Sequence, residues 1–396
     1  MIEKYERGGA VMKIINAKMY YNGSFRTGDM IIRGERFLAI RETDENGKSE
    51  LPELDDQEEI DAHGLLAIPG LVDIHFHGCV GYDMCDGTEE AIQAMADYQQ
   101  SVGVLAICPA TMTYPEDKLA VIAEAAAAHV NGKGADLVGI HMEGPYISPN
   151  KVGAQNPAYV QKPDMEMFAR LQEKAGGLFR QCDIAPEEPG ALEFIRGIRE
   201  TVPSISLAHT TADYDAAMAA FEAGANHLTH CYNAMPGINH RNPGPIIAAV
   251  DAGADAELIT DNVHIHPAVV RATFKLFGDD HVILVSDSMM ACGLPDGQYS
   301  LGGQVVTVKG RLATLTEQEG TIAGSATNLM DCVRRAVQEM GIPLEAAVKA
   351  ASHNPARSIG IDKDYGDIAP GKYANVLLLD DELKLVHVIQ RGKMIF

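Results

Sequence analysis

Short apolar runs alternate with amphipathic segments from Leu65 onward, a pattern that predicts repeated strand–helix units. The runs cover residues 71–75, 104–110, 137–143, 178–185, 204–209, 227–233, 256–261 and 282–287. Several of the segments between them begin with Thr, Pro or Asp and end with Gly, as helices do. Eight parallel strands are the number that closes a barrel, so the pattern favours an α/β fold with a (β/α)8 TIM-like barrel. A doubly wound open sheet stays open as a second interpretation, because spacing alone does not require closure.

The two ends of the chain have a different pattern. Residues 11–40 and 366–396 alternate apolar and polar positions and carry Gly at the turns, which predicts strands. Residues 42–58 form a polar, acidic connection. We expect residues 1–66 and 366–396 to build one small β-sandwich domain from both chain ends, and residues 67–365 to form the catalytic barrel. The stretches 323–341 and 343–360 are expected to be helical.

Charge and composition exclude several classes of protein. The chain has 32 Lys and Arg against 55 Asp and Glu, a formal net charge of −23, so neither nucleic acid nor an anionic membrane is an expected partner. No apolar stretch is long enough to span a membrane, and residues 1–10 lack the apolar segment of a secretion signal. The seven Cys include no CxxC pair, which is typical of the reducing cytoplasm. Translation is expected to start at Met1 or at Met12, where the strand pattern begins.

Side chains that bind metals or transfer protons follow the apolar runs. They are Asp73, His75 and His77, then Thr111, Glu143, Glu187, His209 and His230, then Asp261, His264 and Asp287. In a barrel the carboxyl ends of all strands face one opening, where barrel enzymes assemble their active sites. One or two such residues are ordinary at strand ends, but a series of imidazoles and carboxylates predicts a single site.

Five of these residues form a candidate metal centre. His75 and His77 are two positions apart, so on a strand both imidazoles point to the same side. Glu143, His209 and His230 complete a set of nitrogen and oxygen donors without thiolate, as in hydrolytic metal sites. We expect one or two divalent ions, zinc first, with iron and manganese open because they accept the same donors. Asp287 is placed to take a proton from water and return it to the leaving group.

Longer motifs extend over most of the chain, and with them it resembles the amidohydrolase superfamily, specifically its N-acetylglucosamine-6-phosphate deacetylases. The motifs are PGLVDIHFHG (69–78), HMEGPYISP (141–149), GAQNP (153–157), LAHTTA (207–212), HCYNAMP (230–236), HRNPGPI (240–246), VHIHP (263–267), VSDSM (285–289) and AGSATNLMD (323–331). The resemblance implies a hydrolase of a linear amide that converts N-acetylglucosamine-6-phosphate to glucosamine-6-phosphate and acetate.

The resemblance also implies roles for individual residues. The principal metal falls to Glu143, His209 and His230, a second ion to His75 and His77, and the general base and acid to Asp287. Substrate contacts are implied at Gln155, Asn233, Ala234, Arg241 and His264. A homodimer with shared active sites is implied as well. The guanidinium of Arg241 fits a phosphate locally, which a chain of net charge −23 needs because its overall field repels anions.

One position departs from the family pattern. Relatives usually carry His in the loop motif where this chain has Gln155. Glutamine donates and accepts hydrogen bonds but does not become a cation at physiological pH. The sugar therefore stays open between N-acetylglucosamine-6-phosphate and its galacto epimer. A different amidohydrolase activity, on a cyclic amide or an aminated base, also stays open, as does a catalytically silent sugar-phosphate binding protein.

Overall fold

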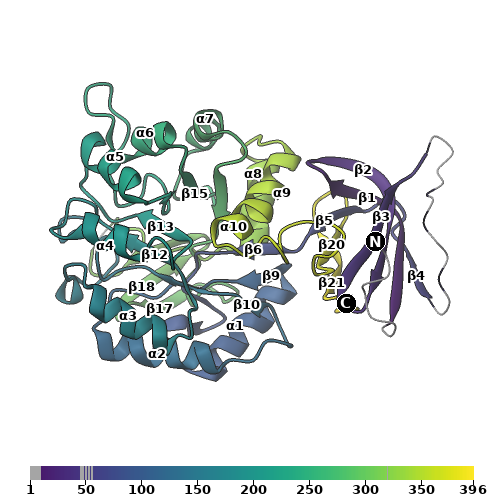
Figure 1. The fold of residues 1–396 in the computed structure, drawn as a ribbon, viewed down its shortest axis with the longest axis horizontal. Coiled ribbons are helices and arrows are strands. Elements are labelled where there is room, and N and C mark those ends of the chain that lie inside the picture. Colours follow the sequence, from purple (N-terminus) through teal and green to yellow (C-terminus); the bar gives the residue numbers. More distant parts are fainter. Residues whose placement is uncertain (1–9, 45–48, 50, 52–53, 55–56, 319) are drawn as a thin grey trace.

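The structure, a computed structural model, describes residues 10–44, 49, 51, 54, 57–318 and 320–396. It has a mixed α/β fold, with a helix-covered body that carries parallel strands and a strand-rich sheet at one end (Figure 1). The expected start at Met1 and part of the acidic connection 42–58 lie outside the described residues. Within the described residues, no helix combines the length and apolar character needed to cross a membrane.

Two parallel sheets form the centre of the body. The larger one contains, in order, β11 (Ile140–Met142), β12 (Phe179–Ile184), β13 (Ser204–Leu207), β14 (His227–Leu228), β15 (Asp255–Ile259) and β16 (Val282–Val285). The smaller one contains β6 (Leu71–Asp73), β9 (Val104–Ile107) and β10 (Asp136–Leu137). Each predicted apolar run contains a strand, so the parallel α/β prediction is confirmed. The run at 137–143 divides, because β10 pairs with β9 whereas β11 pairs with β12.

The two parallel sheets contact each other on both sides. A parallel bridge joins Ala110, which follows β9, to His141 on β11. At the other side the amide of Asp287, which follows β16, donates to the carbonyl of His75, which follows β6, at 2.9 Å. The contact near β9 and β11 joins the two sheets at one side, and the contact between the residues after β6 and β16 joins them at the other.

Helices cover the strands of the body. They are α1 (Glu89–Ser101), α2 (Glu116–Ala128), α3 (Met165–Lys174), α4 (Ala191–Ile198), α5 (Tyr214–Ala223), α6 (Gly244–Ala252), α7 (Pro267–Phe277), α8 (Leu329–Gln338), α9 (Leu344–Ala351) and α10 (His353–Ser358), with the 3-10 turns η1 (Met84–Asp86) and η2 (Pro157–Tyr159). Several begin at a side-chain cap of the predicted kind, such as Thr88 before α1 and Asp213 before α5. This cover buries most residues of the parallel strands, and in β16 every residue is inaccessible to solvent.

The sheet at the end of the molecule combines strands from both chain ends. It contains β1 (Val11–Tyr21), β2 (Ser24–Arg33), β3 (Arg36–Glu42), β4 (Gln57–Asp61), β5 (Leu66–Pro69), β20 (Val376–Leu379), β21 (Leu385–Gln390) and β22 (Lys393–Met394). β5 lies between β1 and β20, so an early strand pairs directly with a late one. A hydrophobic cluster of its own, including Ile14, Phe37 and Val376, packs on this sheet. The outline of a sandwich domain from residues 1–66 and 366–396 stays a prediction.

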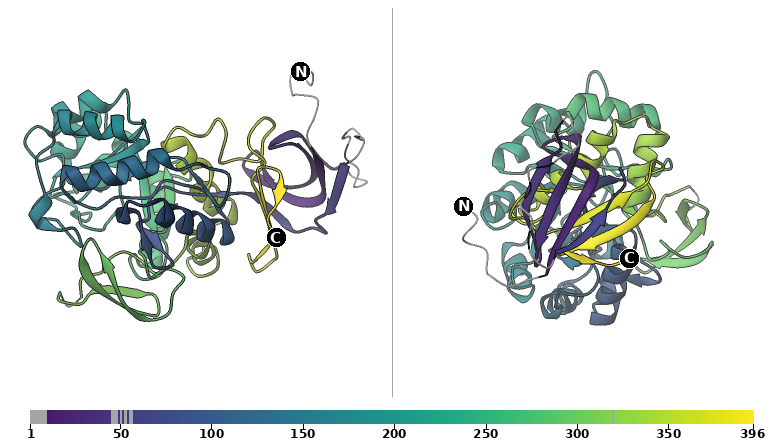
Figure 2. Two further views of the ribbon diagram at one scale, coloured as in Figure 1. Left: turned by 90° about the horizontal axis from the view of Figure 1, so that it is seen from below. Right: turned by 90° about the vertical axis from the view of Figure 1, so that its right-hand side faces the viewer.

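A separate antiparallel sheet, which the sequence pattern did not predict, follows the eighth apolar run. Its antiparallel strands are β17 (Gly297–Leu301), β18 (Gln304–Lys309) and β19 (Leu312–Leu315), and Figure 2 shows it below the body in the left view. A short hairpin of β7 (Gly78–Cys79) and β8 (Tyr82–Asp83) lies earlier in the chain. Gln304 Nε2 donates to the carbonyl of Ala154 at 2.6 Å, so the β17–β19 sheet is bonded to the loop that carries the GAQNP motif.

Candidate active site

Four imidazoles converge on the carboxylate of Glu143. Its Oε1 lies 2.9 Å from Nε2 of His209 and 3.3 Å from Nε2 of His230. Its Oε2 lies 3.0 Å from Nε2 of His77 and 3.6 Å from Nε2 of His75. All five residues are buried. The structure thus brings together every residue that the sequence analysis placed in the metal centre.

The strand ends explain how residues so distant in sequence meet. Glu143 follows β11 directly, and His209, His230 and Asp287 each stand two residues beyond the end of β13, β14 and β16. His75 stands two residues beyond β6. Carboxyl ends of neighbouring parallel strands lie at one edge of a sheet, so residues at these equivalent positions share one side of the body.

Three of these residues hold a strained backbone. His209, His230 and Asp287 have φ angles of 44°, 27° and 47°, in the left-handed region that residues with a Cβ rarely adopt. Such a conformation costs on the order of 1–3 kcal/mol and persists only where the surrounding structure enforces it. Its repetition after three different strands indicates that tertiary contacts, rather than local preference, set the positions of these side chains.

Asp287 lies beside the histidine pair. Its Oδ1 is 3.3 Å from Nε2 of His77 and 3.7 Å from Nε2 of His75. Ser325 donates its amide to the carbonyl of Asp287 at 2.7 Å, while the amide of Asp287 donates to His75. The backbone of Asp287 is therefore fixed by hydrogen bonds at both its amide and its carbonyl, and its carboxylate lies beside His77.

The donor atoms fit one or two divalent cations. His75, His77 and Glu143 form one group, and Glu143, His209 and His230 form another, each with its ligand atoms within 4.8 Å of one another. The Nε2 atoms of His209 and His230 are 3.1 Å apart. The buried Nε2 of His75 makes no hydrogen bond within the described part of the chain. A cation among these atoms would satisfy all of them, and neutral imidazole with carboxylate is a donor set that zinc, iron and manganese accept.

The charges of the side chains themselves favour a cation at this place. Burial alone would raise the pKa of Glu143, but the charge of His77 and hydrogen bonds from His209 and His230 hold that pKa well below its usual range. Burial alone would lower the pKa of His77, whereas Glu143 and Asp287 raise it to about 10. The two carboxylates thus favour positive charge among the imidazoles, and a divalent ion would supply that charge in place of protons.

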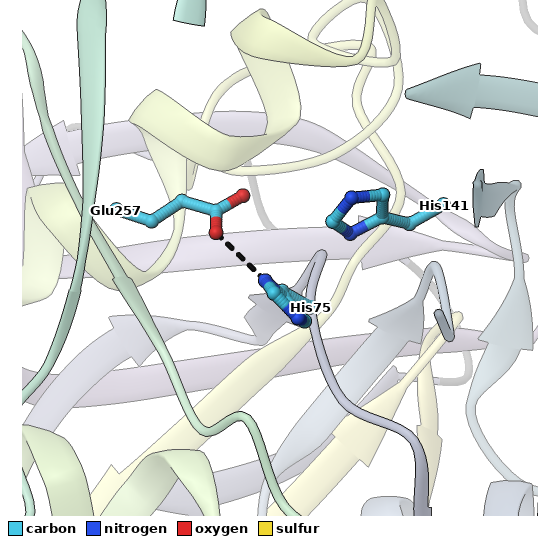
Figure 3. A group of neighbouring side chains, drawn as sticks. All are labelled: His75, His141 and Glu257. Atoms are coloured by element: carbon cyan, nitrogen blue, oxygen red, sulfur yellow. Dashed lines mark hydrogen bonds and ion pairs between the residues drawn. The ribbon is translucent and has the colours of Figure 1, made fainter. Parts of the chain in front are cut away.

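A second layer of polar side chains lies beneath the ligands. Figure 3 shows His75, His141 and Glu257, with Glu257 Oε2 2.8 Å from Nδ1 of His75. Nε2 of His141 lies 2.8 Å from Oδ1 of Asp183. Glu257 and Asp183 were not predicted from the sequence, although each is a carboxylate inside a mostly buried strand, which is a signal for a paired group. His141 was quoted only as part of a motif.

A cavity of about 540 Å³ opens onto the cluster. Among its lining residues are the predicted His77, Glu143, His209, His230, Asp287, Gln155, Asn233, Ala234 and His264. Four further lining residues were not predicted from the sequence: Asn150 and Lys151, which precede the GAQNP motif, Leu301 at the end of β17, and Thr321, which follows β19. The volume suits a small polar ligand such as a sugar phosphate.

The amide of Gln155 has a defined orientation. Its Oε1 accepts a 2.7 Å hydrogen bond from the backbone amide of Thr113, and the residue is 2% exposed. A backbone N–H bonds only to an acceptor, so the atom that faces Thr113 must be the oxygen. Nε2 makes no hydrogen bond to any described residue and is left as a donor beside the cavity.

Of the two residues expected to contact the phosphate, His264 lines the cavity and Arg241 does not. Nδ1 of His264 is 2.8 Å from Oδ2 of Asp261, and the His264 ring reaches the cavity. Arg241 is exposed on the loop before α6, where its Nη1 lies 2.8 Å from Nε2 of His240. It does not line the cavity of its own chain.

Comparison with known proteins is consistent with this site. Residues 66–395 match the amidohydrolase family. The N-acetylglucosamine-6-phosphate deacetylase of Bacillus subtilis (strain 168) is 35% identical over 337 residues, 84% of this chain and 85% of the relative. The N-acetylgalactosamine-6-phosphate deacetylase of Escherichia coli O157:H7 is 33% identical, over 83% of this chain and 87% of the relative. A mutant N-acetyl-D-glucosamine-6-phosphate deacetylase from Mycobacterium smegmatis, solved with N-acetyl-D-glucosamine-6-phosphate, has a TM-score of 0.88 at 28% identity and covers 98% of this chain and 99% of its own.

Proposed function

The chain belongs to the amidohydrolase family, and from this we propose that it hydrolyses the acetamide of N-acetylglucosamine-6-phosphate to glucosamine-6-phosphate and acetate. It is a hydrolase that acts on a linear amide. The observation that carries the proposal is the convergence of four histidines on Glu143 beside Asp287, at a cavity that accommodates a sugar phosphate. Relatives with this activity in their names cover most of the chain.

We infer that Glu143, His209 and His230 hold the principal divalent cation and that His75 and His77, with Glu143, hold a second. When bound, a cation at such a site polarises an amide carbonyl and makes a water molecule more acidic. Zinc is proposed first because four-coordinate nitrogen and oxygen donor sets suit it, while iron and manganese accept the same donors.

Asp287 is proposed to move the proton. Its carboxylate lines the cavity within 3.3 Å of His77 Nε2, where it can accept a proton from the attacking water. An amine is a poor leaving group unless it is protonated, so the same carboxyl would return the proton to the amide nitrogen as the C–N bond breaks. One residue thereby serves as base and then as acid.

The remaining lining residues would orient the sugar phosphate. Gln155 offers its free amide donor to a sugar oxygen, and His264, held by Asp261, offers its ring to the phosphate. Lys151 adds a cationic side chain to the same cavity. Asn233 and Ala234 line it near His230, and we propose that they contact the acetamide end.

We propose that Arg241 acts in the cavity of a second copy of the chain. Its own cavity does not include it, and the loop that carries it also exposes Ile238, which is 46% accessible. A cationic fork beside an apolar side chain is suited to reach across an interface and bind a phosphate there. The proposed assembly is a homodimer with shared active sites.

We further propose that the two parallel sheets form one closed (β/α)8 barrel. Their contacts through Ala110 and His141 on one side and through His75 and Asp287 on the other support closure. The small domain from both chain ends and the cytoplasmic location are retained as proposals.

N-acetylgalactosamine-6-phosphate is the second candidate substrate, favoured by Gln155 in place of the usual His and by the related galacto enzyme at 33% identity. Acetate release from each epimer and from unphosphorylated N-acetylglucosamine tests both. Fast, phosphate-dependent release of acetate from the gluco epimer supports the proposal. Faster release from the galacto epimer would make N-acetylgalactosamine-6-phosphate the substrate instead. Release independent of phosphate indicates another amidohydrolase activity, and ligand binding without release indicates a silent binding protein.

A further inference from the structure

Glu257 occupies an unusual position for a carboxylate. It stands in the middle of β15, and the solvent-exposed fraction of its side chain is 0%. Oε1 lies 2.6 Å from Nε2 of Gln181 and 3.0 Å from Nε2 of His227. Oε2 lies 2.8 Å from Nδ1 of His75 and 3.1 Å from the backbone nitrogen of His230. Each carboxylate oxygen thus has two hydrogen-bonding partners, and two of these four partners belong to His75 and His230 of the candidate metal centre.

These contacts determine the protonation pattern of His75. An ionised carboxylate only accepts hydrogen bonds, so Nδ1 of His75 must carry the proton that lies between it and Glu257. The other ring nitrogen, Nε2, is the atom that faces Glu143 and Asp287 at 3.6 Å and 3.7 Å. With Nδ1 protonated, the Nε2 lone pair is available to a cation, which is how carboxylates orient metal-binding imidazoles in general.

Glu257 also forms hydrogen bonds with the backbone at His230 and Cys231. The side chain of Glu257 accepts the amide of His230, and its backbone carbonyl accepts the amide of Cys231 at 2.9 Å. His230 has the strained φ of 27°, which needs such external support. Glu257 therefore contacts one member of each ligand group around Glu143.

We propose that Glu257 is a positioning residue that presents Nε2 of His75 and the backbone of His230 to the cation site, so that one buried carboxylate couples the two halves of the centre. The proposal rests on the metal centre of the proposed function. A third cation between His75, His141 and Glu257 is the competing interpretation, since their ligand atoms also lie close together. That arrangement would require Nδ1 of His75 to give up its proton, so the two interpretations differ in one observable.

The wild-type protein provides the first test. Nitrogen NMR of histidine-labelled full-length chain, after chelation and after reconstitution with Zn²⁺, reports which ring nitrogens carry protons, and the His75 signals are assigned by their loss in His75→Gln. We expect Nδ1 of His75 to be protonated in both states and Nε2 to carry no proton in the zinc-loaded protein. A deprotonated Nδ1 in the zinc-loaded protein would overturn the proposal.

Glu257→Gln provides the second test, because it keeps the shape of the side chain and replaces one acceptor by a donor. Zn²⁺ affinity, measured by competition with a chromogenic chelator, is expected to fall about 10- to 100-fold. The matched control is Asp183→Asn, an equally buried carboxylate of the same second layer whose partners, His141 and Thr229, are outside both ligand groups. Circular dichroism establishes that each variant is folded, and the NMR experiment does not depend on either variant.

The outcomes separate this inference from the function beneath it. If the wild-type protein binds no cation and releases no acetate, the proposed function fails and this inference fails with it. If the wild-type protein does both but Glu257→Gln binds Zn²⁺ as tightly as wild type, or if Asp183→Asn weakens binding equally, only the positioning role of Glu257 is refuted.

Discussion

The backbone amide of Asp287 donates a 2.9 Å hydrogen bond to the carbonyl of His75. This bond ties the residue that follows the last parallel strand to the residue that follows the first. The proposed proton-transfer group and one proposed metal ligand therefore share a single backbone contact. Changes to the Asp287 side chain can leave that contact intact, so its chemical role is separable from its structural one.

Asp287→Asn removes the proton acceptor and keeps the backbone contact. We expect turnover to fall about 10²- to 10⁴-fold, the usual contribution of general acid–base catalysis. The cation content should stay at the wild-type level because the four histidines and Glu143 are unchanged. Steady-state acetate release together with elemental analysis measures both, and near-normal turnover would remove Asp287 from the mechanism.

Glu143 belongs to both ligand groups, whereas His77 belongs to one. Glu143→Gln is therefore expected to abolish cation binding, and His77→Asn is expected to retain the ion held by His209 and His230. Elemental analysis after dialysis gives the stoichiometry of each variant. Equal losses in the two variants would contradict the division into two groups.

Removal of the cation should lower both activity and stability. A cation that binds only the folded chain stabilises it in proportion to the logarithm of its concentration over Kd, by about 2.7 kcal/mol at a hundredfold excess. We expect chelation to lower the thermal midpoint and abolish acetate release, and Zn²⁺ to restore both. Full activity in a chelated protein without measurable metal would refute the cation requirement.

Gln155 is expected to act as a donor that does not titrate. Gln155→Glu keeps an acceptor for the amide of Thr113 but removes the donor at the cavity, so KM for the sugar phosphate should rise. Gln155→His should introduce a pH dependence near the ordinary imidazole pKa, about 6.5. Gln161→Glu, nearby in sequence but outside the cavity lining, is the matched control for the added charge. An unchanged KM in Gln155→Glu would exclude a substrate contact at this position.

Arg241 permits a complementation test of the homodimer. Arg241→Ala and Asp287→Asn should each be nearly inactive alone. A mixture that exchanges subunits forms dimers in which one site has both wild-type residues, so part of the activity should return. A mixture of Asp287→Asn with Asp287→Ala is the control and should stay inactive. Failure of the first mixture to recover, with exchange demonstrated, would place Arg241 outside a shared site.

Asp367 is expected to make stability depend on pH at the acid end. Burial would raise the pKa of its carboxyl, but hydrogen bonds from His353 and Lys372 lower it below the ordinary value of 3.8. A carboxyl with a lower pKa in the folded state stabilises the fold above about pH 4, and that stabilisation disappears as pH falls through the folded-state pKa.

Asp367→Asn should therefore lower the free energy of unfolding at pH 7 by about 1.5–3 kcal/mol, the scale for hydrogen bonds to a charged group. The difference from wild type should shrink toward pH 3. Urea titrations at the two pH values measure it, with the exposed Asp362→Asn as control. A difference that does not change with pH would attribute the effect to packing.

Local pattern predicted much of this fold. The order of the parallel strands, the helices between them and the caps at Thr88 and Asp213 depend on the spacing of apolar residues and on neighbouring side chains, so they can be read along the chain. The positions of Glu143 and His209 could be predicted for a related reason. Carboxyl ends of parallel strands lie together, so a residue that follows a strand in the sequence is expected at that edge of the sheet.

Other features could not be predicted because they depend on partners far away in the chain. Strands β17–β19 follow the last parallel strand without a comparable pattern, yet Gln304 fastens them to Ala154 across 150 positions. Arg241 belongs to a motif, but its exposure shows that the motif does not place it in its own cavity.

Which side chains stand at the strand ends, and hence what chemistry they can perform, follows from the order of residues alone. That Gln155 presents a donor, because Thr113 occupies its oxygen, and that Glu257 contacts two members of the centre become clear only in the folded chain. Side-chain identity and periodicity are local properties, whereas the direction of a hydrogen bond depends on which distant group the fold places opposite it.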